Sequence, residues 1–310
     1  MGSVLASTRP NTFGITGMVV RIKKKPAEEL DFLVDSVLDP HTPPLARVEP
    51  GETLEIETWS ALTRVTNPVT GPIYVEGTEP GDALVVEVLD IELPGHGTVA
   101  IIPGFGSLEG WLRLLEPRRK TCAISDGRIA YETDDGRTLK IAADPFIGTI
   151  GVSPEFEAIT SLSPGRHGGN MDCPDVRPGN RLLLPVFRPG ALFKLGDVHA
   201  VQGDGEVCGV AVEVDAVVTL KLGLRKGWTI GWPRIESPDE IMTVGSARPL
   251  EDAARYAFRE MVEWMASDHG WERDDAYMFL SLAAKARIAQ IVDPLYTVVA
   301  KLKKKYVGGV

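Results

Sequence analysis

Short apolar runs with alternating polar positions fill the first two thirds of the chain and predict a strand-rich fold. At three places a Pro-Gly pair stands before such a run, and these two residues suit the two central positions of a type II turn. The pattern predicts strands over residues 54–58, 84–91 and 182–187 after these turns. Further apolar stretches predict strands over residues 17–20, 32–34, 122–129, 139–141, 213–222 and 296–302.

Helical periodicity is strongest near the end of the chain. Residues 250–267 follow a proline at a helix-start position, carry apolar side chains at helical spacing and end near Gly270. Residues 274–288 predict a second helix, with its aromatic and methionine positions in core packing and with one face made of Tyr277, Leu280, Ala284 and Ile288.

These elements predict a mainly β fold of sandwich or barrel-like sheets with a C-terminal helical pair, α+β overall. The recurring Pro-Gly turn has two interpretations, an internal duplication or the repeated use of a common turn. We expect an N-terminal β-rich half over residues 1–150. The C-terminal half, residues 151–310, holds the two helices and the motifs described below.

Composition narrows the class of protein. The 310 residues are 44% hydrophobic and 25% charged, which is ordinary for a globular chain. The net charge of −10 gives no electrostatic support for nucleic-acid binding. No apolar run approaches the roughly 20 residues that span a bilayer, and the start is too polar for a signal peptide. Three cysteines without a C-x-x-C spacing argue against disulfides and favour a cytoplasmic location.

Residues 161–214 hold two segments with candidate chemistry. The first, RHGGNMD, sets a histidine, an amide and a carboxylate beside adjacent glycines. The second, GDVHAVQGDGEVC, is typical of a strand, a Gly-rich turn and a second strand. A hairpin with a two-residue turn at Gly203-Asp204, or with a four-residue loop, sets His199 opposite Cys208 and Val201 opposite Glu206, whereas a three-residue loop would break this register. In this register Asp197, His199, Glu206 and Cys208 project from one face. Glu213 lies on the opposite face, where we expect an internal partner and not a ligand.

Two kinds of chemistry fit these segments, and a third interpretation gives them no chemical role. An imidazole with two carboxylates is a first coordination shell for a divalent metal. Thiol nucleophiles are the second kind, with Cys173 and Cys208 beside His167 and His199. A serine route is disfavoured because the chain has no G-x-S-x-G elbow. The third interpretation is a surface hairpin whose charges face water.

Five runs in order resemble the acetamidase/formamidase family: NPVTGPIYVEGTEPGDAL, HGGNMD, PGALFKLGDVHAVQGDGEVCG, WPRIESPDEIMTVG and DDAYMFLSLAA. The similarity extends from about Asn67 to Ala284. It implies hydrolysis of small aliphatic amides to a carboxylate and ammonia by a homo-oligomer, a dimer or trimer, with a divalent metal. Zinc is the expected metal and calcium is the alternative. The motifs contain Asn170, Asp172, Asp197, His199, Asp204 and Glu206.

Residue type and predicted facing suggest a role for each candidate. The predicted metal ligands are Asp172, Asp197 and His199. They would activate a water molecule, whose proton Glu206 passes to the leaving nitrogen. Asn170 would stabilise the oxyanion. Gly168, Gly169 and Glu155 are the predicted substrate contacts.

The chain also departs from the family pattern. The segment after Trp59 is shorter than in typical members, and the part before Pro44 lacks the expected histidine and tryptophan pattern. That edge of the fold is expected to supply part of the substrate pocket. The alternative function is therefore a non-catalytic or divergent small-molecule-binding member of the same scaffold.

Overall fold

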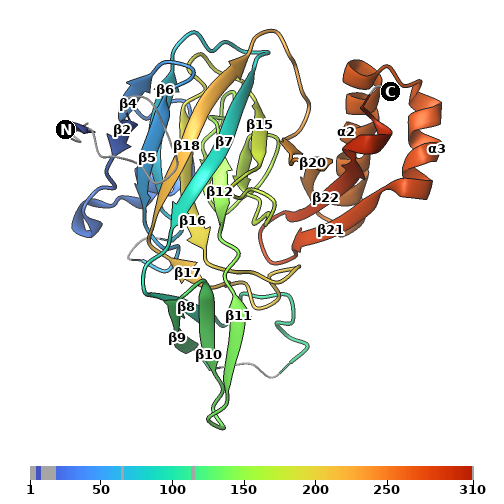
Figure 1. Cartoon of the computed structure of the whole chain (residues 1–310). Coiled ribbons are helices and arrows are strands. Elements are labelled where there is room, and N and C mark those ends of the chain that lie inside the picture. The colour runs from blue at the N-terminus through green and yellow to red at the C-terminus, as the bar shows by residue number, and fades with distance from the viewer. Residues whose placement is uncertain (1–4, 8–18, 64–65, 113–115, 309–310) are drawn as a thin grey trace.

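A computed structural model describes residues 5–7, 19–63, 66–112 and 116–308. Its described part is 42% strand and 14% helix, which confirms the mainly β, α+β fold with a C-terminal helical pair. Most strands lie in two large sheets (Figure 1). A separate two-stranded sheet pairs β3 (Val37–Leu38) with β13 (Ile159–Thr160).

The first large sheet mixes strands from distant parts of the chain. Its order is β1 (Leu5–Ser7), β2 (Val19–Ile22), β5 (Thr53–Thr58), β18 (Ala216–Arg225), β7 (Ala83–Glu92), β15 (Arg181–Pro185), β19 (Arg234–Glu236), β20 (Glu240–Ala247), β22 (Tyr296–Lys303) and β21 (Lys285–Gln290). The predicted division at residue 150 stays a prediction, and strands from both sides of it alternate in this sheet.

The second large sheet carries the candidate chemistry. Its order is β11 (Thr138–Ala142), β10 (Arg128–Glu132), β9 (Arg118–Ser125), β8 (His96–Ile101), β17 (Glu213–Val214), β16 (Phe193–His199), β12 (Phe146–Gly151) and β14 (Gly168–Asn170). β6 (Val69–Val75) joins it through β16, and β4 (Ala46–Val48) pairs with β6. The end formed by β8, β9, β10 and β11 projects away from the body (Figure 1).

The main core lies between the two sheets. Leu54 and Ile56 of β5 belong to the same buried cluster as Ile73 of β6 and Phe193 of β16. Each such side chain stabilises the fold by about 1.5–3 kcal/mol when it leaves water. β12 and β16 are buried at every position, so their polar residues lie inside the protein.

The Pro-Gly turns precede strands as the sequence indicates. Gly51, Gly81 and Gly179 have φ of 100°, 91° and 88°, the positive values that a type II turn needs at its second central position. β5, β7 and β15 follow these turns. The predicted strand at residues 17–20 begins outside the described residues, and its described part starts at Val19 in β2.

The C-terminal helices flank the far end of the first sheet (Figure 1). α2 (Leu250–His269) follows Pro249 and ends at Gly270, where a left-handed backbone lets the amide cap the Met265 carbonyl. Its buried side chains include Trp264 and pack with those of β20 and β22. α3 (Arg273–Ala283) follows it. Within the described residues, no helix is long and apolar enough to cross a membrane.

Four predicted elements are wrong in detail. Residues 213–222 form parts of two strands, because β17 lies in the second sheet and β18 in the first. Residues 32–34 lie in a short helix, α1 (Phe32–Asp35), next to a 3-10 turn η1 (Ala27–Glu29), and the Asp31 carboxylate caps α1. Residues 122–129 form parts of two strands, because left-handed Asp126 and Gly127 make a tight turn between β9 and β10.

The second predicted helix, residues 274–288, is also too long. α3 ends at Ala283, and the next residues form β21, which pairs with β22. Tyr277, predicted in the core, is 68% exposed on α3. The chain closes with β22 and a 3-10 turn, η2 (Lys304–Tyr306).

Candidate metal centre

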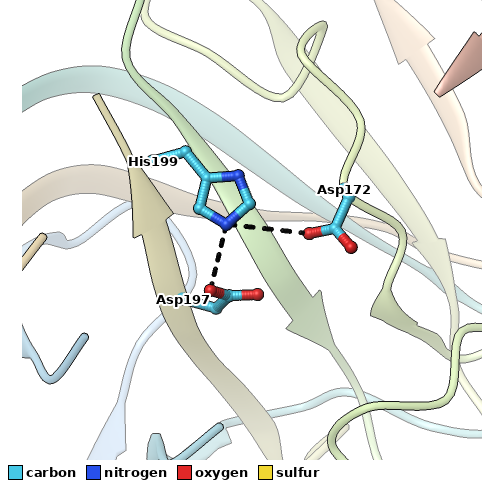
Figure 2. Close-up of side chains that lie close together, drawn as sticks. All are labelled: Asp172, Asp197 and His199. Carbon is cyan, nitrogen blue, oxygen red and sulfur yellow. Dashed lines mark hydrogen bonds and ion pairs between the residues drawn. The ribbon is translucent and has the colours of Figure 1, made fainter. Parts of the chain in front are cut away.

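The candidate site lies at the end of β16, an interior strand of the second sheet. β16 pairs with β12 on one side and with β17 and β6 on the other. Asp197 and His199 are two residues apart on this strand, so their side chains project from the same face. Asp172 follows β14 and reaches the same place (Figure 2).

His199 meets three carboxylates through one ring nitrogen. Its Nε2 lies 3.1 Å from Asp197 Oδ1, 3.2 Å from Glu213 Oε1 and 4.0 Å from Asp172 Oδ1. All four side chains are buried. The sequence-predicted ligands Asp172, Asp197 and His199 are therefore brought together, and Figure 2 shows both aspartates facing the same ring nitrogen.

Gln202 fixes which nitrogen of His199 carries a proton. The Gln202 amide nitrogen donates to the carbonyls of Asp172 and Ala289, both at 3.0 Å, so its Oε1 is an acceptor. That oxygen lies 2.9 Å from His199 Nδ1, which must therefore donate. In neutral imidazole this leaves the Nε2 lone pair directed at the carboxylates, the arrangement that a metal ligand needs.

Two more acids complete the group. Glu206, from the loop after β16, is buried near His199 and Glu213, and the ligand atoms of these three residues lie within 4.8 Å of one another. Asp293, from the loop between β21 and β22, is also buried and accepts a 2.9 Å hydrogen bond from Asn170. Four buried carboxyl groups thus lie around His199, and the fifth, Asp293, is joined to Asp172 through Asn170.

Burial dominates the electrostatics of these acids. It raises the pKa of Asp172 to about 6 and that of Glu213 to about 8, and the charge of Asp197 adds to both shifts. Burial also raises the pKa of Glu206 and of Asp293 well above the usual carboxyl range. Burial opposes protonation of His199, yet Glu213 and Asp197 outweigh it and raise the pKa of His199. The group therefore favours additional positive charge.

The arrangement fits a divalent cation. Asp172 Oδ1 and Glu213 Oε2 are buried and have no hydrogen-bond partner among the described residues. A side chain at Gly148 would set a Cβ 2.5 Å from Asp172 Oδ1 and 2.9 Å from Asp197 Oδ2, so glycine leaves both oxygens their room. One imidazole nitrogen with several carboxylate oxygens is a donor set that divalent metals accept.

Asn170 lies inside the group, but its polar atoms are held by protein. Its amide donates to Asp172 Oδ2 and Asp293 Oδ2, both at 2.9 Å. Its Oδ1 accepts from Asn67 and from the hydroxyl of Thr149. The oxyanion role of Asn170 stays a prediction, and its contacts are those of a residue that positions two carboxylates.

The three predicted substrate contacts, Gly168, Gly169 and Glu155, take no part in the hydrogen bonds of Asn170. Gly168 and Gly169 are buried in β14, where a Cβ would overlap the carbonyls of Ile150 and Ser163 respectively. Close backbone packing thus explains both glycines, and their substrate role stays a prediction. Glu155 is exposed in the loop after β12, and its role also stays a prediction.

The predicted hairpin is wrong. β16 ends at His199, and the residue opposite it is Glu213 of β17, not Cys208. Directly opposed residues share a face, so Glu213 joins the site although the sequence prediction turned it away. Gln202 and Asp293 were also missed. The available signal for Glu213 was a carboxylate inside the apolar run Val210–Val214, because a charge in a buried strand needs a partner.

A thiol mechanism has little support in this geometry. Cys173 is buried, and burial with the charge of Asp175 raises the pKa of its thiol to about 12. Burial lowers the pKa of His167 to about 4, so that ring is neutral at pH 7. Cys208 donates from its sulfur to the Val210 carbonyl at 3.1 Å. The nucleophilic thiolate is the reactive form, and Cys173 does not reach it near neutral pH.

Solved structures share this fold. The chain has a TM-score of 0.86 and 36% identity with an acetamidase from Yersinia enterocolitica, and the match covers 96% of this chain and 95% of that one. An acetamidase from Bacillus halodurans gives 0.84 and 34%, covering 93% and 100%. The strand-rich fold of this chain is thus the fold of a class of proteins whose solved members are acetamidases.

The sequence comparisons name the family within that class. The family model described as "Acetamidase/Formamidase family" matches residues 151–302. An acetamidase from Mycolicibacterium smegmatis is 27% identical over 279 residues, covering 69% of this chain and 65% of that protein. This chain therefore spans about two thirds of the length of that curated relative. It belongs to the acetamidase/formamidase family, which confirms the resemblance seen in the sequence.

Proposed function

We propose that this chain hydrolyses a small linear amide, of the formamide or acetamide kind, to a carboxylate and ammonia. One observation carries the proposal: a single ring nitrogen of buried His199 faces three carboxylates. The acetamidase and formamidase names of its relatives support the same reaction. The substrate itself is inferred from those names.

The proposed ligands are His199 Nε2, Asp172 and Asp197, with Glu213 beside them. A divalent cation held there would polarise the amide carbonyl and lower the pKa of a water molecule. Gln202 keeps the proton of His199 on Nδ1, and Asn170 holds Asp172 in place. Zinc is the proposed metal and calcium the alternative.

Glu206 is the proposed proton carrier. The water oxygen forms a bond to the carbonyl carbon, and Glu206 takes the proton that this oxygen releases. It then delivers that proton to the nitrogen as the C–N bond breaks, so ammonia leaves and the carboxylic acid that remains loses its own proton to solvent at neutral pH, which gives the carboxylate. Burial raises the pKa of Glu206, so its carboxylate is a stronger base once ionised, and a cation bound nearby would favour that ionised form.

The variant His199→Ala tests the metal role. We expect it to lose the bound metal and to release ammonia from formamide and acetamide at least about 100-fold more slowly, since even an indirect contact to a ligand contributes about 10–100-fold. Elemental analysis and an ammonia assay, with and without a chelator, measure both. The matched control is His96→Ala, because His96 is exposed at the start of β8. Full activity of His199→Ala would end the metal role.

A divergent binding protein is the second candidate function. The shorter segment after Trp59 favours it, and the intact His199 group favours hydrolysis. A panel of formamide, acetamide and lactams discriminates between them. Metal-loaded protein that releases ammonia from none of these would support binding.

Assembly and location are proposed on separate grounds. We infer a homo-oligomer, a dimer or trimer, from the family resemblance, and light scattering on the purified protein measures its mass. A cytoplasmic location follows from three free cysteines, two of them buried. Fractionation of the expressing cells checks it.

A further inference from the structure

A second pocket lies between α2, the loop before β19 and the loop before β14. Its volume is about 560 Å³. The lining residues that matter are Arg166, Trp232, Arg234, Tyr256, Arg259 and Glu260. None of them belongs to the His199 group. The pocket therefore needs an explanation of its own.

Arg234 is the most unusual residue of this pocket. It is only 3% exposed, and its guanidinium lies over the rings of Trp228 at 5.1 Å and Trp264 at 4.9 Å. Its Nε donates to Glu260 Oε1 at 2.7 Å. Its Nη1 is buried and has no acceptor among the described residues. An unmatched buried donor destabilises the fold, so an acceptor supplied by a ligand would be stabilising.

The acids near the pocket are already occupied. Glu260 accepts from Arg234 and from the amide of Gly231. Glu263 also lines the pocket, and it is paired with Arg273 at 2.8 Å. Two positive groups are left over in a chain whose net charge is −10.

Those two groups are Arg166 and Arg259. Arg166 uses its Nε on the Gly231 carbonyl at 2.9 Å and lies over the ring of Phe187. Neither Arg166 nor Arg259 has an ion pair with a carboxylate in the described part of the chain. The pocket thus gathers three arginines from three segments, and two of them, Arg166 and Arg259, have no carboxylate at ion-pair distance among the described residues.

We propose that this pocket binds a small oxyanion, a carboxylate or a phosphate. The guanidinium groups of Arg166 and Arg259 have free N–H donors, and planar guanidinium matches the two oxygens of either group. Arg234 lines the buried side of the pocket and adds a third positive charge. Trp232, stacked on Tyr256 at 4.9 Å, forms an aromatic wall for the rest of the ligand.

Isothermal titration calorimetry with sodium acetate and with inorganic phosphate, at constant ionic strength, tests the proposal. We expect saturable binding of one anion, with the Kd raised at least about tenfold in Arg259→Ala and in Arg166→Ala, as for the loss of one charged contact. The matched control is Arg255→Ala, which lies one turn earlier on α2, bonds to Asp252 and does not line the pocket. Arg234 is left intact because its loss would strand Glu260.

The outcomes separate this pocket from the candidate metal centre. Binding retained in His199→Ala and weakened in Arg259→Ala supports the proposal, and the anion that binds identifies the group as carboxylate or phosphate. No saturable binding of either anion overturns it. A Kd that is unchanged in both arginine variants also overturns the proposal, as does binding that is lost in His199→Ala alone. Thermal unfolding of each variant confirms that the exposed substitutions leave the fold intact.

Discussion

Three acids of the candidate metal centre have backbone conformations that ordinary residues avoid. Asp172, Asp197 and Glu206 have φ of 42°, 53° and 46°. Each such residue costs of the order of 1–3 kcal/mol, and such residues cluster where function requires them. The surrounding strands hold these carboxylates in place although five acids share one buried volume. The strained backbone and the crowded acids both lower the stability of the metal-free fold, which supports the proposal that a cation completes the group.

The variant Gly148→Ala tests whether the proposed metal site needs the observed positions of its carboxylates. In Gly148→Ala the new methyl group would overlap carboxylate oxygens of Asp172 and Asp197, so both side chains must move away from it. We expect a loss of metal affinity and of ammonia release of at least about tenfold, because ligand placement within about 0.5 Å matters. Elemental analysis and the ammonia assay measure these. Gly95→Ala is the control, since its Cβ would meet open space; equal activity of the two variants would contradict the prediction.

The pKa values of the acids predict how pH changes the stability of the metal-free protein. Burial raises the pKa of Asp172 from 3.8 to about 6 and that of Glu213 from 4.5 to about 8. Between those values the folded chain binds more protons than the unfolded chain, so stability falls as pH rises. The raised pKa of His199 acts in the same direction. Asp197, whose pKa is lowered, acts only below about pH 4.

A bound cation takes the place of those protons. We therefore expect the Tm difference between metal-loaded and chelator-treated protein to widen from about pH 5 to about pH 8. Thermal unfolding at several pH values measures it. In Glu213→Gln the upper part of this dependence should shrink, because the carboxyl group whose pKa burial raises to about 8 is removed. A difference that stays constant with pH would refute the explanation.

Single residues also show what the sequence can predict. Asp172, Asp197 and His199 were found from motif and alternation, and they do meet. Glu213 was missed because its position depends on which strand pairs with β16, and a turn pattern suggested the wrong partner. Gln202 and Asp293 reach the site from loops, whose paths have no sequence period.

Among the elements, strands and α2 follow their sequence patterns while β21 does not. Residues 285–290 continue the helical spacing of α3, but pairing with β22 gives them a strand conformation. Tertiary pairing overrides local preference in such short segments. The Pro-Gly turns were reliable because their backbone conformations are fixed by residue type.

The anchoring of α2 yields a prediction about stability. Trp264 is 2% exposed and packs in the core that α2 forms with β20 and β22. We expect Trp264→Ala to lower the free energy of unfolding by about 3–5 kcal/mol through the lost contacts and the cavity. Chemical denaturation measures it. Tyr277→Ala, on the exposed face of α3, should change it by no more than about 0.5 kcal/mol; similar losses in both variants would refute the assignment of the core.

For the whole molecule, the fold class was predictable and the strand order was not. Alternating apolar positions indicate strands and their buried faces, as in Leu54 and Ile56 of β5. They do not say that β5 pairs with β18, more than 150 residues away. That choice depends on how two complete sheets close over one core. The family resemblance gave the fold and the motifs, but not this order.

The pairing of β5 and β7 with β18 also has a consequence for synthesis. The ribosome releases β5 and β7 long before residues 216–225 exist, so these early strands expose unmatched edges while translation continues. The longer the sequence between two pairing strands, the longer the earlier strand stays unpaired during translation. A nascent chain stalled before residue 216 should therefore be prone to capture by chaperones, and release of β18 from the exit tunnel pairs these two edges.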